Sequence, residues 1–385
     1  MQLPDANSPS LHLSHPTESE KTAILTLNSK SWGTALALPD YLDRETHMTT
    51  VPDLTRNDGL TYFVLVDKNS MPDSRLILGS LETTRKRALI ARNGQVWEVI
   101  SHAIGSVFCN PEYRGKGYAG RMLRELGPVL NKWQTDEKVD GRKECAFSIL
   151  YSDIGKKYYA KFGWMPFPST HISFPPSPAT NGASTNGHIN DAQVATTLKD
   201  ADIEALCALD EQYIRKELVQ AKDGKTHVAL VPDYAQMKWH ALREDFMTAR
   251  LFSKSPTIRG AISGTAGNRV WALWTRSFYG PLDSIESGNM LHFLRLVIED
   301  EKDVAGNVKK LRDIVKIAQK EAAEWKLTGV EIWNPTPVVK EILSKLDVEH
   351  SEVERDEHSI PCLLWYGEDS VDDLVWVGNE KFGWV

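Results

Sequence analysis

A short glycine turn between an apolar run and a helical pattern, in residues 107–122, constrains the fold more than any other part of the chain. Gly115 and Gly117 lack a Cβ atom, so the backbone can turn sharply there and bring its N–H groups close to a ligand. Those N–H groups begin the helix that is predicted to follow, and a helix N-terminus carries roughly half a positive charge. With the cations Arg114 and Lys116 beside it, the turn predicts a site for a pyrophosphate.

The helix after the turn is predicted from the spacing of its apolar residues. They recur three or four positions apart, as on the buried face of an amphipathic helix that packs on a sheet. The residues are Ala119, Met122, Leu123, Leu126, Val129, Leu130 and Trp133. Gly127-Pro128 should kink or shorten this helix, but its first turns carry the phosphate end and are unaffected.

A glycine turn before a helix is also compatible with a tight connection that binds nothing. The turn is not a Walker loop, because no Gly-Lys-Ser/Thr ends it, and its glycine spacing does not match the dinucleotide fingerprint. A second passage favours a binding site. Glu144–Leu150 reads as an apolar strand, and the helical turn after it ends in Tyr159-Ala-Lys-Phe-Gly163-Trp164.

The turn and the second passage together resemble the GNAT superfamily of acyl-CoA-dependent N-acetyltransferases. In that superfamily the acetyl-CoA loop reads Gln/Arg-x-x-Gly-x-Gly/Ala and a later motif reads Tyr-x-x-x-Gly-Phe. Arg114, Gly117 and Ala119 match the loop. Tyr159 and Gly163 match the later motif, where a tryptophan replaces the usual aromatic residue. The resemblance implies a GNAT fold, which is an α/β fold with a mixed sheet, and acetyl-CoA as the cosubstrate.

The resemblance also implies which residues bind acetyl-CoA: the end of the strand before the loop, the loop itself, the start of its helix and the end of the next strand. These residues are Val107, Phe108, Cys109, Arg114, Gly115, Lys116, Gly117, Tyr118, Ala119 and Ser152. During acyl transfer the thioester carbonyl oxygen gains negative charge. A backbone N–H freed by a bulge in the strand, at Val107 or Phe108, would stabilise that charge.

Several segments distributed over most of the chain carry a narrower resemblance. They are ALALPDYLDRE near residue 40, YFVLV, IGSVFCNPEYRGKGYA, YSDIGKKYYAKFGW, PDYAQMKWH, VEIWNP and VWVGNEKFGWV. They resemble the fungal L-lysine N6-acetyltransferase family, in which a catalytic half precedes a family-specific C-terminal half. This implies free L-lysine as the acceptor and a role in lysine catabolism. A protein lysine or another small amine stays open as the acceptor, and so does a non-catalytic, CoA-binding regulator.

Composition limits the partners and the compartment. The formal net charge of −7 argues against a nucleic-acid partner, because no basic tract is available to displace counterions. No apolar run approaches the roughly 18 residues of a membrane span, and neither a signal peptide nor a transit peptide is visible. The four cysteines lack metal-binding spacing and read as thiols in a reducing compartment. We therefore expect a cytoplasmic enzyme with small-molecule substrates, no membrane partner and no metal. The oligomeric state is not indicated.

The length of 385 residues and a segment rich in Pro, Gly, Asn and Ser predict two domains. We predict an acetyl-CoA-binding domain at 1–175, a linker at 176–190 and a family-specific C-terminal domain at 191–385. A long exposed loop within the first domain is the alternative for the linker segment. The first domain is expected to be a mixed sheet with helices on both faces, and Thr170–Phe174 is expected to be its last strand.

The C-terminal half echoes the order of strands and helices expected in the first half. After its central strand the chain runs IEDEKDVAGNVKKL, which is acidic where phosphates would need cations and lacks paired glycines. We infer a degenerate GNAT-like repeat that binds no cofactor and shapes the acceptor site. An unrelated α+β domain is the alternative.

Acetyl transfer to lysine requires two proton transfers. The amine has a pKa of about 10.4, so its neutral form costs roughly 4.6 kcal/mol at pH 7 and a base must take the proton. Glu98 and His102 are the candidates, because they lie four residues apart on the strand that leads to the loop and share a face. The GNAT resemblance assigns Tyr159 as the acid for the CoA thiolate, and a phenol with a pKa of about 10 is protonated at pH 7. The alternative for Tyr159 is a core tyrosine bonded to a carbonyl.

Free lysine also carries an α-carboxylate and an α-ammonium. A selective site would bind the first with a cation and the second with an acid. Many residues qualify, among them Arg85, Arg87, Arg295 and Glu380, and the sequence does not choose among them.

Overall fold

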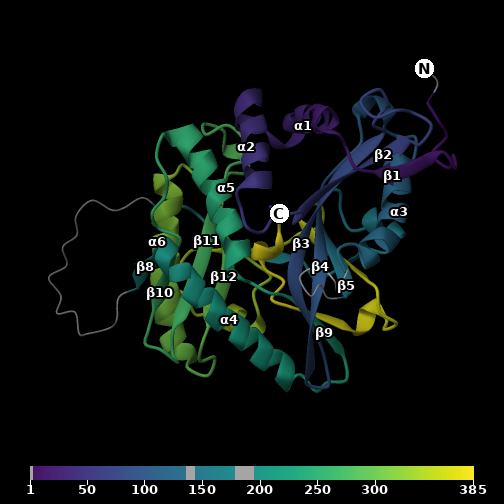
Figure 1. Ribbon diagram of the computed structural model, residues 1–385. Helices are drawn as coiled ribbons and strands as arrows, with labels where there is room; N and C mark the ends of the chain where they lie inside the picture. Colours follow the sequence, from purple (N-terminus) through teal and green to yellow (C-terminus); the bar gives the residue numbers. More distant parts are fainter. Residues whose placement is uncertain (1–2, 136–143, 178–194) are drawn as a thin grey trace.

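The computed structural model describes residues 3–135, 144–177 and 195–385. They form two lobes, each built on a mixed β-sheet (Figure 1). The first sheet runs in the order β1-β2-β3-β4-β5-β15-β6, and β9 joins it by pairing with β3 on one side and β16 on the other. Its strands are β1 (Leu11–Ser14), β2 (Leu60–Asp67), β3 (Gly79–Arg92), β4 (Gln95–Phe108), β5 (Cys145–Ser152), β6 (Met165–Pro166), β9 (Thr226–Leu230), β15 (Ile360–Trp365) and β16 (Leu374–Val377). Strands β4 and β5 are parallel, whereas β2, β3 and β4 are antiparallel neighbours.

The second sheet runs in the order β14-β7-β13-β12-β11-β10-β8. Its strands are β7 (Thr170–Phe174), β8 (Thr196–Leu198), β10 (Gly260–Ser263), β11 (Val270–Ser277), β12 (Met290–Ile298), β13 (Val330–Trp333) and β14 (Ser351–Glu354). The helices are α1 (Glu18–Trp32), α2 (Leu38–Thr50), α3 (Tyr118–Lys132), α4 (Asp200–Gln220), α5 (Tyr234–Phe252), α6 (Val304–Glu324) and α7 (Pro337–Leu343). The predicted α/β class with a mixed sheet is confirmed.

Helix α3 forms where the apolar spacing predicts it. Its N-cap, Gly117, has a left-handed φ of +86°, which a residue with a Cβ rarely adopts. The apolar face is completely buried in the core of the first lobe at Met122, Leu123, Leu126 and Leu130. Pro128 lies inside the helix, which continues to Lys132 and is therefore not shortened at that point.

Strands of each half of the sequence lie in the sheet of the other half: β7 lies in the second sheet, and β9, β15 and β16 lie in the first. Strand β7 pairs with β13 and β14 in the second sheet, so the expectation that Thr170–Phe174 ends the first sheet is wrong. The edge of β5 that does not face β4 pairs with β15, a strand of the second half of the sequence. The apolar pattern of a strand predicts burial but not its neighbour, because any apolar strand of suitable length can pair with an exposed edge.

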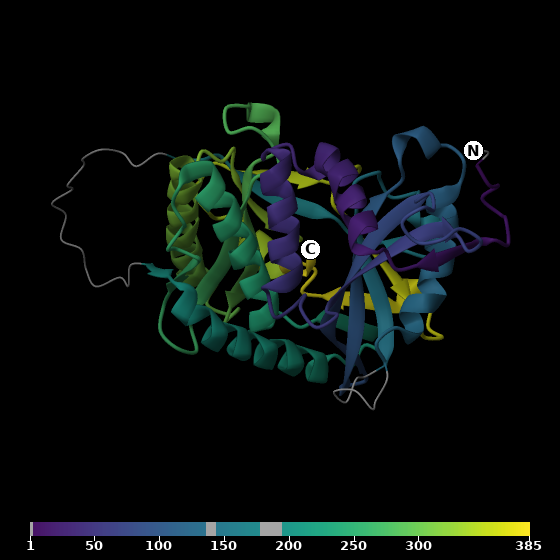
Figure 2. The same ribbon diagram turned by 45° about the horizontal axis from the view of Figure 1, so that its top comes forward.

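The predicted linker at 176–190 lies almost entirely outside the described residues. The proposed domain limits stay predictions, and the exchanged strands cross them. The C-terminal end of the chain lies between the two lobes in both views (Figures 1 and 2). There Phe382 belongs to an apolar cluster that also contains Phe147 of β5 and Trp271 of β11, so the lobes share part of their core.

None of the helices in the described ranges is both long enough and apolar enough to cross a membrane. Within residues 3–135, 144–177 and 195–385, no group of three or more His, Cys, Asp or Glu side chains is arranged to hold a metal ion. The four cysteines are free thiols.

Candidate active site

The loop before α3 has the geometry expected of an anion site. Gly115 and Gly117 both have positive φ values, +77° and +86°. A Cβ atom added at Gly115 would meet no described atom within 4 Å, so the loop surface is open there. Gly117 has no side chain with which to cap the helix, so the first N–H groups of α3 stay available to an anion. Arg114 and Lys116 are both exposed beside the loop.

The corresponding helix of the second lobe is closed by its own residue. Helix α6 follows strand β12 as α3 follows β4. Its N-cap is Asp303, whose carboxylate accepts a hydrogen bond from the N–H of Gly306 at 3.0 Å. Asn268 and Lys310 also donate to this carboxylate. An anion at this helix end would have to displace a carboxylate that the chain already supplies.

Strand β4 contains a bulge immediately before the loop. Ser80 of β3 pairs with Phe108, but Glu82 pairs with Gly105, so β4 has one residue more than β3 over this interval. Ser106 has a left-handed φ of +50°. The bulge therefore lies between Gly105 and Phe108, which includes the predicted position Val107. A bulge leaves backbone groups out of the strand ladder, and a freed N–H could face a developing oxyanion.

Glu82 is a candidate base that the sequence analysis missed. It lies between Tyr62 and Gly105 on the neighbouring strands, and its Oε1 accepts a hydrogen bond from the Ser106 hydroxyl at 2.8 Å. Burial, with a contribution from the nearby Glu45, raises the pKa of Glu82 to about 7. An acidic residue inside a strand is a feature of the sequence that could have indicated a functional role for Glu82. That it faces the bulge depends on the strand register, which the sequence does not show.

A cavity of about 210 Å³ lies beside the bulge. Its lining comes from α1, from the start of β3 and from the segment after β4: Ala23, Ile24, Leu27, Arg75, Leu76, Ile77, Gly79, Ser80, Phe108, Asn110 and Tyr113. Ser80 and Glu82 are two residues apart on β3 and therefore point to the same face. The cavity and the Glu82 carboxylate are thus neighbours on the face that α1 covers.

Tyr159 lies in the one-turn helix η2 (Tyr159–Phe162) and is 8% exposed. Burial raises its pKa, so its proton is retained at neutral pH. Within the described part of the chain, no hydrogen-bond partner is seen for the hydroxyl. Gly163 ends the turn at φ +96°, and a Cβ there would approach Leu364 of β15 to 2.8 Å. The glycine of the second motif is thus explained by the close approach of the exchanged strand.

The two bases expected from the sequence do not lie at the bulge. Glu98 forms a hydrogen bond and ion pair with Arg215 and lies eight positions before Ser106, on the order of 26 Å along the strand. His102 is fully buried, and its Nε2 contacts the Trp133 carbonyl oxygen at 3.1 Å. Burial lowers the pKa of His102 to about 4, so it is neutral at pH 7. Glu98 and His102 lie on the same strand, but their position along β4 separates both residues from the loop.

The other predicted cofactor residues have clear local contacts. Ser152 is buried and donates to the Gly155 carbonyl at 2.7 Å, so it shapes the turn after β5. The Cys109 thiol donates to the Leu78 carbonyl at 3.3 Å, and burial raises its pKa. The Tyr118 hydroxyl donates to the Pro4 carbonyl. Their roles in binding acetyl-CoA, like that of the half-buried Ala119, stay predictions.

Three of the residues considered for the acceptor already have partners. Arg295 forms ion pairs with Asp210, at 2.7 Å, and with Glu380. Arg87 pairs with Glu211 at 2.9 Å. These charges neutralise one another within the protein, so they do not favour an acceptor site.

Comparisons with known proteins identify the family and several relatives of this chain. Residues 171–385 match the family described as LYC1 GNAT-like C-terminal domain. An uncharacterized protein of Saccharomyces cerevisiae is 24% identical over 393 residues, which cover 93% of this chain and 93% of that protein. A Yarrowia lipolytica protein named lysine acetyltransferase is 23% identical over 271 residues, which cover 63% of this chain and 66% of that protein.

Two solved structures share the fold. The N-myristoyltransferase of Saccharomyces cerevisiae, solved with bound myristoyl-CoA and inhibitors, matches with a TM-score of 0.51 and 9% identity, covering 100% of this chain and 88% of that one. A probable N-acyltransferase from Enterococcus faecalis matches with a TM-score of 0.50 and 11% identity, covering 92% of this chain and 72% of that one. The predicted GNAT fold and its GNAT-like C-terminal domain are confirmed. The chain belongs to the family that carries the LYC1 GNAT-like C-terminal domain, and it is a GNAT N-acetyltransferase close to the fungal lysine acetyltransferases.

Proposed function

We propose that this acyltransferase moves the acetyl group of acetyl-CoA to the N6 amine of free L-lysine. The observation that carries the proposal is the β4 bulge, with the Glu82 carboxylate on one side and the open N-terminus of α3 on the other. The name of the Yarrowia lipolytica relative supports lysine as the acceptor. A cytoplasmic role in lysine catabolism is part of the same proposal.

In the proposed reaction the neutral lysine nitrogen attacks the thioester carbonyl carbon, and the C–S bond then breaks. Glu82 takes the proton that the amine must lose, directly or through a water. Its raised pKa of about 7 suits this task, because a base works best when its pKa lies near the working pH. A backbone N–H at the bulge stabilises the oxyanion. Tyr159 gives its hydroxyl proton to the departing thiolate.

The acceptor is tested by assaying the purified protein with acetyl-CoA against L-lysine, ornithine, spermidine and a histone-tail peptide. We expect the highest kcat/KM for lysine, with the product acetylated at N6. A clear preference for the peptide or for spermidine would overturn the proposed acceptor while leaving the acyltransferase chemistry in place.

The base is tested by Glu82→Gln, which keeps the size of the side chain. General base catalysis typically contributes about 10²–10⁴-fold, so kcat/KM should fall by that order while acetyl-CoA affinity is kept. In the wild type, kcat/KM should rise with pH until Glu82 has lost its proton, at about pH 7. Glu98→Gln is the matched control and should behave as wild type. The opposite result would return the base to Glu98.

The acid is tested by Tyr159→Phe, with Tyr158→Phe as the control on the adjacent ring. The first change should lower kcat by about 10²–10⁴-fold with little change in the KM for acetyl-CoA. The second should leave kcat nearly unchanged. A Tyr159→Phe enzyme with normal kcat would show that water or another group protonates the thiolate.

The two helix ends predict the number of cofactor sites. Calorimetry should give one acetyl-CoA per chain, because α6 is capped by Asp303 and α3 is not capped by a side chain. Gly117→Glu places a bulky anion at the α3 end and should abolish measurable binding. Two equal sites, or unchanged affinity in Gly117→Glu, would contradict the assignment of the loop.

A further inference from the structure

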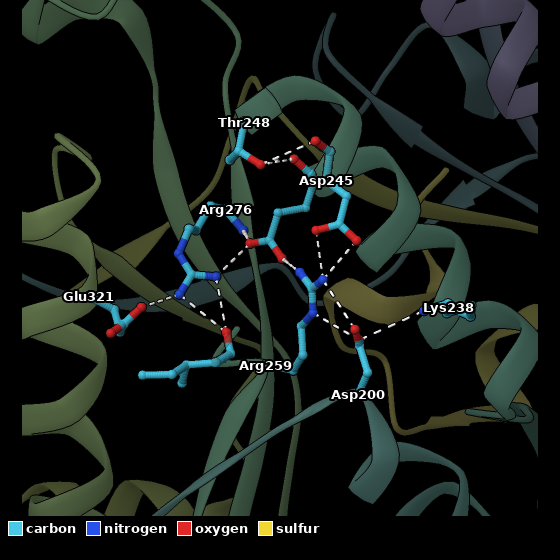
Figure 3. A network of polar contacts seen from close by, with 9 residues as sticks. Asp200, Lys238, Asp245, Thr248, Arg259, Arg276 and Glu321 are labelled. Atoms are coloured by element: carbon cyan, nitrogen blue, oxygen red, sulfur yellow. Dashed lines mark hydrogen bonds and ion pairs between the residues drawn. The ribbon is translucent and has the colours of Figure 1, made fainter. Parts of the chain in front are cut away.

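Most buried arginines of this protein have carboxylate partners. In the second lobe, Arg259 pairs with Asp200, Glu244 and Asp245, and Arg276 pairs with Glu244 and Glu321 (Figure 3). Each of these guanidinium groups is thus neutralised by acids that the chain supplies. We call this group the paired network.

A second group of cations, of which Lys381 and Arg355 are buried and Arg243 is half-buried, differs. Arg243 of α5, Lys381 near the C-terminal end and Arg355 after β14 have no carboxylate oxygen within 4.0 Å in the ranges that the structure describes. Arg243 has only aromatic contacts there: its guanidinium carbon lies 5.9 Å from the centroid of the Tyr279 ring and 5.5 Å from that of Trp384. We call these three residues the unpaired cation cluster.

Lys381 completes one side of this cluster and is 2% exposed. Its Nζ lies 4.1 Å from the centroid of the Trp384 ring, 4.2 Å from that of Trp333 and 3.5 Å from the Tyr279 hydroxyl. Arg243 and Lys381 therefore converge on the same pair of rings, Tyr279 and Trp384. Two cations beside the same rings repel each other unless an anion joins them.

Arg355 closes the other side of the cluster. It lies over Trp333, with its guanidinium carbon 4.1 Å from the ring centroid. Two of its nitrogens donate to Ser169 and to the Thr170 carbonyl. The third, Nη2, is buried and finds no partner among the described residues. A charged donor without an acceptor is unfavourable inside a protein, and such groups point to a missing partner.

The pKa values of the three cations also indicate that their positive charges are not compensated as those of the paired network are. Burial lowers the pKa of Lys381 to about 7 and that of Arg355 to about 10. Burial also lowers the pKa of Arg243, and the neighbouring Arg44 contributes. In the paired network, by contrast, Glu244 and Asp245 raise the pKa of Arg259 despite burial.

The cluster lies next to the reaction centre. The chain that carries Lys381 and Trp384 continues to Val385, whose carbonyl oxygen would lie 3.8 Å from a Cβ at Gly105, the residue that pairs with Glu82. On the other side, the charge of Glu45 acts on both Arg243 and Glu82. The unpaired cations and Glu82 are thus linked through the C-terminal residues and through Glu45.

We propose that Arg243 and Lys381 bind the carboxylate of the acceptor, which is therefore a free amino acid and not a peptide or a plain amine. The proposal rests on the proposed function, because it places the acceptor amine at Glu82 and the acceptor carboxylate at the cluster. The carboxylate accepts hydrogen bonds from both cations and supplies the direct carboxylate contact that the described residues do not. A lysine within a peptide has no free α-carboxylate, and a polyamine has none at all.

The test compares N6 acetylation of L-lysine with that of L-lysinamide, which replaces the carboxylate by a neutral group. Wild type should prefer lysine in KM, with similar kcat. Arg243→Gln and Lys381→Gln should each raise the KM for lysine by roughly 10- to 100-fold, the range expected for loss of a hydrogen bond between charged groups. The KM for lysinamide and for acetyl-CoA should change little. Arg243→Lys, which keeps the charge, should recover part of the loss.

Arg250→Gln is the matched control, since Arg250 is on the same helix but is exposed and pairs with Asp40 and Asp43. It should keep the wild-type preference for lysine. Circular dichroism and thermal melting confirm that each variant is folded.

Two failures can be told apart. If wild type acetylates lysine but does not prefer it to lysinamide, or if both Gln variants keep the preference, the carboxylate site is wrong and the proposed function stands. If wild type acetylates some other amine and neither lysine nor lysinamide, the proposed function is wrong and the assignment of the acceptor carboxylate falls with it.

Discussion

The paired network and the unpaired cation cluster meet on a single helix. Glu244 of α5 joins Arg259 and Arg276, while its chain neighbour Arg243 belongs to the cluster. Arg259 and Arg276 link α4, α5, β11 and α6, and the chain supplies carboxylate partners for both guanidinium groups. Where the cluster faces the region between the lobes, its cations contact aromatic rings, and among the described residues no carboxylate oxygen lies within 4.0 Å of them. The difference indicates that the first charges serve the fold and the second serve a ligand.

The network also explains how Arg243 can stay in place without a partner of its own. Glu244 is anchored by two arginines, so the helix backbone beside Arg243 is fixed. A rigid element that carries an unsatisfied group is what a binding site requires, because the geometry exists before the ligand arrives. Stability is given up at such sites in favour of function.

Removal of an arginine from the paired network should have the largest effect on the stability of the protein. Arg276→Met leaves Glu244 and Glu321 buried with fewer partners, and loss of one member of a buried ion pair costs about 3–5 kcal/mol. Denaturant unfolding should show this loss. Arg312→Met, at a partly exposed pair with Asp313, is the control and should lie close to wild type. If the two changes lowered the free energy of unfolding equally, the paired network would not have the proposed structural role.

The reverse change in the cluster should stabilise the protein. Below a pH of about 7, Lys381 is charged in both the folded and the unfolded chain, and its burial is unfavourable. Between about 7 and the ordinary value of 10.5 the folded protein loses this proton first, so stability rises with pH in that window.

Lys381→Met removes the buried charge and should therefore add about 1–4 kcal/mol at pH 6. The gain should shrink as the pH approaches 10.5. Charged groups around Lys381 act in both directions and are kept in the variant: Asp153, Arg243, Glu331 and Arg355. Unfolding measured at several pH values checks the prediction. If the variant is less stable than wild type at pH 6, the charge of Lys381 has a stabilising partner in the folded protein.

A carboxylate ligand should relieve the cluster and leave the network unchanged. 6-Aminohexanoate keeps the amine and the carboxylate of lysine but lacks the α-ammonium. At a concentration of 100 times its Kd it should stabilise the wild type by about 2.7 kcal/mol, which a thermal shift measures. Arg243→Gln should lose most of this shift. The idea would be refuted by equal protection from 1-aminohexane, which has no carboxylate.

The smallest effect is expected outside both groups. Arg250→Gln removes exposed ion pairs with Asp40 and Asp43, and such pairs contribute about 0.2–1 kcal/mol. High salt should reduce even this difference. If Arg250→Gln lost as much free energy of unfolding as Arg276→Met, burial would not explain why the two ion pairs differ in strength.

Local features of the site could be read from the sequence, and its long-range features could not. The loop around Gly117 and the helix after it depend on residues close in sequence, so their pattern predicts them. Glu82 becomes a candidate only because the register of β3 against β4 places it opposite the bulge. Arg243 and Lys381 lie far apart in the sequence, and no periodicity connects them.

The expected bases show the same limit on a smaller scale. Alternation along a strand predicts which face a residue occupies, and His102 and Glu98 were chosen for that reason. Strand β4 is 14 residues long, so a shared face still leaves room for wide separation. The exchange of β7 and β15 was equally invisible, because apolar strands do not encode their neighbours.

That exchange has a consequence for how the protein is made. During translation β5 leaves the ribosome early, but the strand that pairs with its free edge, β15, ends at Trp365. An unpaired edge is a site where nascent chains stick to one another, and contacts between distant residues form slowly. The first lobe therefore cannot close until Trp365 has been synthesised. In the cell, chaperones would have to cover the free edge of β5 until β15 has been made. The first half expressed alone would leave this edge exposed permanently.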